Sequence, residues 1–101
     1  MIPINYTFKN LSDKEKKEVA DYMVLKEERF DNLMRRFTNA ECRLDVKAER
    51  FATKSAYFID LSLYMPGQKI MAREDDHTLR EAIDLAIDKL VIQLRKLVNR
   101  K

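Results

Sequence analysis

Basic side chains near the end of the chain recur at helical spacing, and the chemistry that they offer is phosphate contact. The stripe consists of Lys89, Gln93, Lys96 and Arg100. Successive members are three or four residues apart, so one flank of a helix would carry them all. After Asp88 the chain has five basic residues and no acid. A row of like charges repels itself unless a polyanion lies against it, so this flank is a candidate phosphate-binding ridge.

The ordinary alternative for these cations is a solvated helix end. Positive charge in the last turns of a helix complements the helix dipole, so spacing alone does not distinguish the two interpretations. Arg95 lies on the opposite flank, with Asp84 and Asp88, and could pair with these acids instead. It is the less favoured phosphate ligand of the group.

Four further cations fall where a polyanion could reach them: Arg35, Arg36, Arg43 and Lys47. The first two lie at the end of a predicted helix, and the other two share the outer face of a predicted strand. Asp45 and Glu49 lie on that same strand face, so ion pairing is the competing interpretation. Phe58 and Tyr64 also point outward and could stack on bases, although such rings more often pack against cross-strand neighbours.

Residues for catalysis or metal binding do not assemble in this sequence. Gly67 is the only glycine, which argues against phosphate loops that need several. His77 stands alone without ligand spacing, and Cys42, the only cysteine, should be a small core residue. We therefore expect no enzyme, no metal, no cofactor and no small-molecule substrate.

The composition is that of a folded and highly charged domain. A length of 101 residues suits one domain, 1–101, and 37% charged residues balance 46% hydrophobic ones. The net charge of +3 is modest, so binding to a polyanion depends on how the charge is distributed. The sequence contains neither a membrane-spanning run nor a signal peptide, which predicts a cytoplasmic protein.

The polar and apolar spacing predicts the elements that must position these residues. Alternation predicts strands at residues 2–8, 42–48 and 57–65, and a short fourth strand around Ile70 and Ala72. Capping boxes at residues 12–15 and 78–81 predict helix starts. The first helix should run to about Phe37. The second buries a core stripe of Ile83, Ile87, Leu90, Leu94 and Leu97.

The element order, β-α-β-β-β-α, predicts an α+β fold in two layers. Each strand has one apolar face and each helix one apolar stripe, so both helices should cover one face of a four-stranded sheet. The other sheet face should stay open to water.

The order of elements and several motifs resemble the ribosome hibernation-promoting factor family, also called the ribosome-associated inhibitor or sigma-54 modulation family. The specific part is EAIDLAIDKL at residues 81–90, continuing to QLRK at residues 93–96. Upstream, LSLYMPG at residues 61–67 and IMA at residues 70–72 resemble the family's strand, turn and strand. LMRRF at residues 33–37 resembles the end of the family's first helix.

The resemblance implies a double-stranded-RNA-binding-like fold and a short-form ribosome factor. Such a factor would occupy the mRNA and tRNA channel of the small ribosomal subunit under stress and inhibit translation without catalysis. The predicted rRNA-binding residues are then Lys89, Lys96, Arg100, Arg95, Arg35, Arg36, Arg43 and Lys47.

Three positions depart from the family pattern and, together with the acids that offset the lysines of the first predicted helix, support a second hypothesis. The family often has an aromatic residue near the position of Arg80. It usually has an arginine at the position of Ile92 and often a basic residue at the position of Val98. Ile92 lies away from the core stripe, beside Leu85 and Val91, where it could contact a protein. The alternative is therefore a protein-interaction module that keeps the fold, no longer binds ribosomes and self-associates through its last helix.

Overall fold

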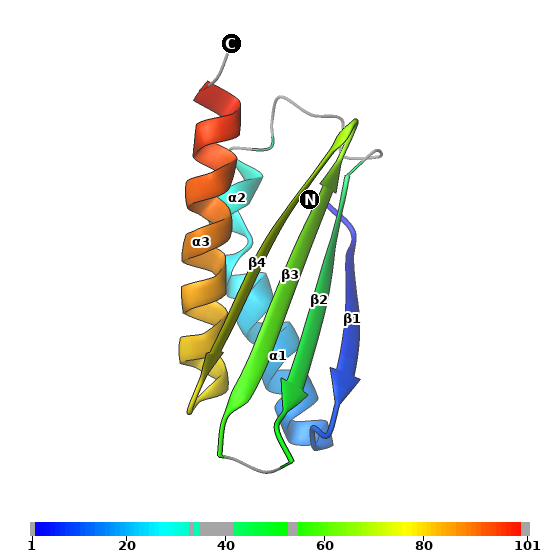
Figure 1. Ribbon diagram of the computed structural model, residues 1–101. Coiled ribbons are helices and arrows are strands. Elements are labelled where there is room, and N and C mark those ends of the chain that lie inside the picture. Colours follow the sequence, from blue (N-terminus) through cyan, green and yellow to red (C-terminus); the bar gives the residue numbers. More distant parts are fainter. Residues whose placement is uncertain (1, 33, 35–41, 53–54, 100–101) are drawn as a thin grey trace.

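The computed structural model describes residues 2–32, 34, 42–52 and 55–99. The chain forms β1 (Ile4–Lys9), α1 (Asp13–Lys26), α2 (Glu28–Asp31), β2 (Arg43–Arg50), β3 (Tyr57–Met65), β4 (Gln68–Asp76) and α3 (Leu79–Asn99). Figure 1 shows an elongated molecule, whose extents are 44 × 22 × 21 Å. None of the described helices is long and apolar enough to cross a membrane.

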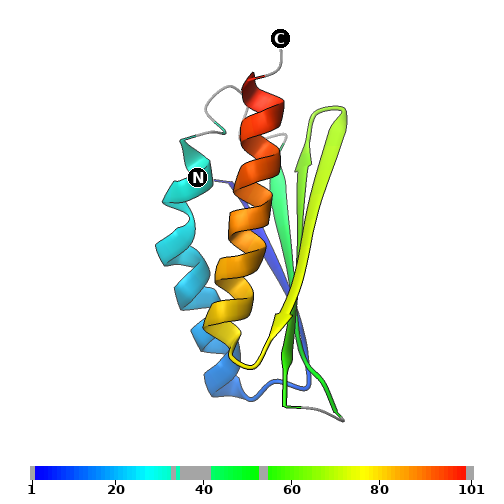
Figure 2. The same ribbon diagram turned by 60° about the vertical axis from the view of Figure 1, so that its left-hand side comes forward.

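The four strands form one mixed sheet in the order β1-β2-β3-β4. β1 pairs with β2 in parallel, and the two remaining pairs are antiparallel. A parallel pair needs a crossover connection, and the segment that contains α1 and α2 supplies it. Both long helices lie on the same side of the sheet (Figure 2), so the predicted two-layer α+β fold is confirmed.

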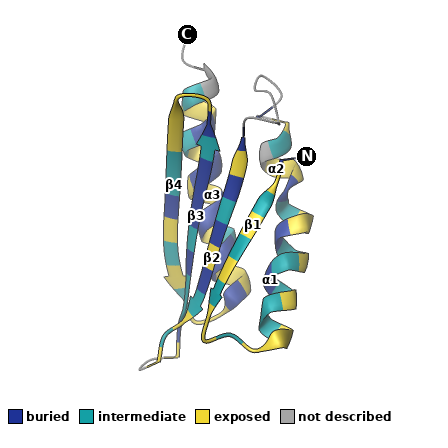
Figure 3. Ribbon diagram, turned by 90° about the vertical axis from the view of Figure 1, so that its right-hand side faces the viewer, coloured by how far each residue is buried: buried dark blue, intermediate teal, exposed yellow. Residues whose placement is uncertain are grey.

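Alternating burial along the central strands separates the core face from the open face. The inward positions are buried from Leu44 to Ala48 in β2 and from Ile59 to Met65 in β3, while the outward Arg43 and Lys47 of β2 remain exposed (Figure 3). The helix layer contributes the predicted stripe of α3, of which Ile83, Ile87, Leu90 and Leu94 are fully buried and Leu97 packs against the core. Cys42 is also buried, as expected.

The capping box at Ser12 is confirmed and the second one is half formed. The Ser12 hydroxyl accepts from the Glu15 backbone amide at 3.2 Å, and the Glu15 carboxylate accepts from the Ser12 amide at 2.9 Å. Thr78 likewise accepts from the Glu81 amide at 3.2 Å. The nearby Asp76 carboxylate interacts with that of Glu81 and raises the pKa of Glu81.

The prediction of one long first helix is wrong at Glu27. There the backbone amide bonds the carbonyl of Val24, three residues earlier, at 3.4 Å, and a separate helix, α2, follows. This tightened turn buries the Glu27 side chain, which is only 4% exposed. Residues 35–37, the predicted end of the helix, lie outside the described residues.

The fourth strand is longer than predicted. β4 extends over nine residues to Asp76, well beyond the apolar pair Ile70 and Ala72 on which the prediction rested. Its second half is polar, yet every residue pairs with β3. The hairpin turns at Pro66 and Gly67, where the glycine adopts a φ of 73° that few other residues tolerate.

Candidate nucleic-acid interface

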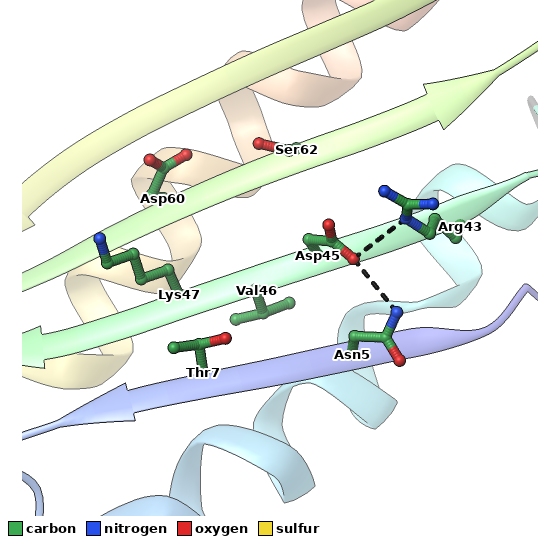
Figure 4. Close-up of a pocket in the computed structure, with 8 residues that line it drawn as sticks. All are labelled: Asn5, Thr7, Arg43, Asp45, Val46, Lys47, Asp60 and Ser62. Carbon is green, nitrogen blue, oxygen red and sulfur yellow. Dashed lines mark hydrogen bonds and ion pairs between the residues drawn. The ribbon is translucent and has the colours of Figure 1, made fainter.

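A polar groove crosses the open face of the sheet (Figure 4). It has a volume of about 380 Å³ and is lined by Asn5, Thr7, Arg43, Asp45, Val46, Lys47, Asp60 and Ser62. Three adjacent strands contribute these residues, and all except the inward-facing Val46 lie at alternate, outward positions. The groove therefore brings Arg43 and Lys47, two of the predicted RNA-binding cations, to one surface.

At one side of the groove, a single oxygen of Asp45 contacts both Arg43 and Asn5. Arg43 Nε lies 3.4 Å from Asp45 Oδ1, and Asn5 Nδ2 donates to the same oxygen across 3.3 Å. The ion-pair interpretation is thus correct for Arg43. Its guanidinium keeps further N–H donors, since only Nε takes part in this pair.

Lys47 lies directly across from Asp60, but the two do not pair. Asp60 Oδ2 instead bonds Arg73 Nε of β4 at 3.2 Å. The other oxygen, Asp60 Oδ1, is buried and has no hydrogen-bond partner in the part of the chain that the structure describes. Within the described residues Lys47 has no ion-pair partner, so its charge is available to a ligand.

Tyr64 positions two cations on the same open face. The guanidinium carbon of Arg43, from β2, lies 4.1 Å from its ring centroid, and Lys69 Nζ, from β4, lies 5.0 Å away. The ring therefore packs against cross-strand neighbours, as the more ordinary interpretation held. Phe58 similarly packs against Phe51, with centroids 6.1 Å apart. Lys69 was missed as a site residue, and the signal for it was its position opposite Tyr64 in the hairpin.

Only the first part of the basic stripe of α3 lies against the edge of the sheet. β4 is an edge strand, and α3 side chains bond its outward carbonyls. Gln93 Nε2 donates to the Met71 carbonyl across 2.6 Å, and Lys89 Nζ donates to the Arg73 carbonyl across 3.4 Å. Lys89 also forms an ion pair with Glu74. The first half of the stripe therefore covers a sheet edge that would otherwise be open to another strand.

Lys96, in the second half of the stripe, makes no such contact with the described residues, and neither does Arg95 on the other flank. Lys96 and Arg95 are exposed, and neither forms an ion pair with any residue that the structure describes. Asp84 and Asp88, the acids considered as partners of Arg95, pair instead with Lys26 of α1 and Arg29 of α2. Arg100, with Arg35 and Arg36, lies outside the described residues.

Asp84 and Asp88 of α3 form a row of polar contacts with α1 and α2, which we call the ladder. Asp84 Oδ1 lies 3.4 Å from Lys26 Nζ, and Asp88 Oδ1 lies 2.6 Å from Arg29 Nη1. The Tyr22 hydroxyl reaches both oxygens of Asp84, at 2.9 and 2.8 Å. Burial and this hydrogen bond raise the pKa of Tyr22, while the bond to Asp84 raises the pKa of Lys26. The ladder stabilises the helix layer and leaves the open sheet face unobstructed.

Metal ligands do not gather in the part of the chain that is described. No group of three His, Cys, Asp or Glu side chains there is arranged to hold an ion. His77 is exposed, with Nδ1 3.1 Å from the Ser55 carbonyl. The chemistry of the open face is thus hydrogen bonding and charge.

Known proteins share both the sequence pattern and the fold. A family model described as "Sigma 54 modulation protein / S30EA ribosomal protein" matches residues 4–101. None of the curated proteins matches the sequence significantly. The N-terminal domain of Protein Y from Thermus thermophilus is similar in structure, with a TM-score of 0.68, 23% identity, and 95% of this chain and 99% of that one covered.

A second solved structure has a comparable likeness. It is a ribosomal subunit interface protein from Coxiella burnetii, with a TM-score of 0.63, 18% identity, and coverage of 98% of this chain and 100% of that one. At these identities the two structures establish the shared fold, and the family model carries the relationship in sequence.

Proposed function

Because the chain belongs to the family of sigma-54 modulation proteins and S30EA ribosomal proteins, we propose that it binds the small ribosomal subunit and inhibits translation under stress. The protein would occupy the channel that mRNA and tRNA use, and would act by occupancy without chemical catalysis. A ribosomal partner implies a cytoplasmic location. The similarity to a ribosomal subunit interface protein supports the same class of partner.

The observation that carries the proposal is that four cations, on the open sheet face and in the last turns of α3, have no acidic partner among the described residues. Lys47 and Lys69 lie on the open sheet face, and Arg95 and Lys96 lie in the last turns of α3. Each cation that neutralises an RNA phosphate releases counterions, which makes binding favourable and dependent on salt. The elongated shape, twice as long as it is wide, suits a channel better than a flat surface.

The roles within the predicted site differ in this proposal. Lys47, Lys96 and Arg95 would make direct phosphate contacts, and Arg43 would contribute the donors that Asp45 leaves free. Lys89 would contribute mainly through the sheet edge, because Glu74 already neutralises it. Arg35, Arg36 and Arg100 stay in the proposal on the basis of sequence alone.

Co-sedimentation with isolated small subunits tests the proposal. The purified protein is mixed with subunits across a salt series, with mRNA or initiator tRNA as competitor. We expect binding that falls steeply with salt and that the competitor displaces. Absence of binding at low salt would contradict the proposal.

A second function is favoured by two exposed apolar residues of α3. Leu85 is 41% exposed and Ile92 is 52% exposed, and seven residues separate them, so they lie on one flank. This flank could join two copies of the chain in a protein-interaction module. Val91, which the sequence placed in the same patch, is buried and belongs to the core. The size of the particle in solution distinguishes the two functions.

A further inference from the structure

The middle of the open-face groove presents hydrogen-bond acceptors that the protein does not use. Asp45 takes both of its contacts through Oδ1, so its Oδ2 has no partner among the described residues (Figure 4). Ser62 faces Asp45 across the β2-β3 pair, and its hydroxyl makes no hydrogen bond with the part of the chain described. Asp60 Oδ1, on the same side of β3, also has no partner among the described residues, but it is buried, so it contributes negative charge and is not open to a ligand.

Two cations bracket these acceptors along β2. Arg43, Asp45 and Lys47 are alternate residues, so all three project from the same face. From Arg43 to Lys47 the outward charges are thus positive, negative and positive, and Glu49, the next outward residue, pairs with Lys9 of β1. About 13 Å separates the two cations at the usual rise of a strand. Acceptors therefore occupy the centre of the groove, and phosphate ligands lie at its two ends.

This order of charges determines which part of a nucleic acid can lie in the centre of the groove. A phosphate placed in the centre would meet Asp45 and Asp60 and be repelled. A nucleobase placed there would instead offer N–H donors to the free acceptors, while its backbone phosphates reached Arg43 and Lys47. Guanine has two adjacent N–H donors on one edge, whereas uracil has a single N–H group. Unpaired bases are read in this way on the edges that duplex formation would hide.

Building on the proposed ribosomal RNA partner, we propose that this groove binds an unpaired guanine of RNA. The N1–H and N2–H groups of the base are directed at Asp45 Oδ2 and the Ser62 hydroxyl oxygen. Arg43 and Lys47 hold the phosphates on either side. The open face then confers base preference, and the cations of α3 contribute affinity that does not depend on sequence.

Short RNA probes test this assignment with the full chain. Fluorescence anisotropy at fixed salt compares uridine heptamers whose central residue is uridine, inosine or guanosine. Inosine keeps N1–H and lacks the N2 amino group. For the wild type we expect the guanosine heptamer to bind about tenfold more tightly than all-uridine, with inosine between them. Equal affinities for the three probes would overturn the assignment.

Two isosteric variants separate base reading from net charge. Asp45→Asn and Asp13→Asn each remove one negative charge, but Asp13 is a fully exposed residue at the start of α1, which belongs to the helix layer on the other side of the sheet (Figure 2). Both variants should bind the all-uridine heptamer somewhat more tightly, because each removes a negative charge, and Asp13→Asn should tighten the guanosine heptamer by the same factor. Only Asp45→Asn should bring the guanosine-to-uridine ratio close to one. A ratio that Asp45→Asn leaves unchanged would overturn the assignment.

The ribosome measurement keeps the two proposals separable. Subunit co-sedimentation is performed in parallel with the wild type. Retained subunit binding together with equal heptamer affinities overturns the guanine site alone. A guanosine preference that depends on Asp45 supports the site even where the subunits do not bind, and in that case the ribosomal function fails.

Discussion

Gln93 of α3 donates its side-chain N–H to the backbone carbonyl of Met71 on β4, with nitrogen and oxygen 2.6 Å apart. One turn earlier, Lys89 makes a similar contact with the Arg73 carbonyl. The helix flank that spacing marks as a phosphate ridge is therefore, over its first half, the cover of a sheet edge. Polar and charged side chains on this flank of α3 thus either cover the sheet edge or stay available for phosphate contact. Substitutions at the two kinds of position should therefore have different effects.

Replacing Gln93 by Leu should destabilise the fold. The Met71 carbonyl would lose a donor while the apolar side chain keeps a similar volume, so we expect the free energy of unfolding to fall by roughly 1–2 kcal/mol. Lys96→Met, on the free half of the stripe, should change it by less than about 0.5 kcal/mol. Urea denaturation measures both variants. Equal stability of the two would show that the edge contact contributes nothing.

Tyr22→Phe should weaken the contact between the helices. The variant removes the hydroxyl that bonds both oxygens of Asp84 and retains the ring that Lys26 and Arg80 approach. We expect a loss of about 1 kcal/mol in unfolding free energy. Tyr6→Phe is the matched control, since the Tyr6 hydroxyl forms no hydrogen bond with the described residues. A larger loss for the control would contradict the role of the ladder.

Glu27 should make stability depend on pH. Burial, and then the nearby carboxylate of Asp31, raise the pKa of Glu27. The folded protein therefore binds this proton more tightly than the unfolded chain, and stability falls as pH rises from the ordinary carboxyl pKa through the raised one. Glu27→Gln should lack that fall and have a higher melting temperature than the wild type at neutral pH. The control is Glu28→Gln, an exposed neighbour, which should follow the wild type across a melting series from acid to neutral pH.

Charge reversal on the free cations should weaken subunit binding. Lys47→Glu and Lys96→Glu each remove one proposed phosphate contact, so we expect the slope of log K against log salt to decrease in magnitude by about one for each. Lys16→Glu is the charge-matched control, because Lys16 pairs with Asp13 at the start of α1, away from the proposed contacts. Melting temperatures would verify that the folds are intact. An identical slope for all three variants would exclude these two contacts.

Ile92→Lys should leave the size of the particle unchanged if the ribosomal function is correct. Ile92 is half exposed, so a lysine there costs little in stability. Light scattering across a concentration series compares the variant with the wild type. A wild-type dimer that Ile92→Lys dissociates would favour the protein-interaction module. A monomer in both cases would count against it.

Local pattern was sufficient for most of the fold. Alternation located the buried faces of β2 and β3, and a helical repeat located the core face of α3. Each of these elements has a strong apolar period, which is a local property. The first helix was predicted to continue past Glu27, although its apolar face is interrupted at Lys26 and Glu27, where the structure has a tightened turn. β4 was made too short, because its second half is polar and forms a strand only through pairing with β3.

The candidate site was predictable in part for the same reason. A period of two is enough to place Arg43 and Lys47 on one open face. It does not reveal that Arg73 engages Asp60 and leaves Lys47 free, or that Lys69 joins Arg43 on the ring of Tyr64. These contacts join three strands, and their geometry depends on the register of the whole sheet.

The sequence by itself determined the elements, their buried faces and the family to which the chain belongs, because apolar periods, capping residues and motifs are encoded over short distances. Only the tertiary structure decided which charges are free. Asp84 pairs with Lys26, and Asp88 pairs with Arg29. Lys89 pairs with Glu74. By contrast, Lys47, Arg95 and Lys96 have no ion-pair partner among the described residues. Ion pairs form between side chains that packing brings within a few ångströms, and packing depends on every element at once.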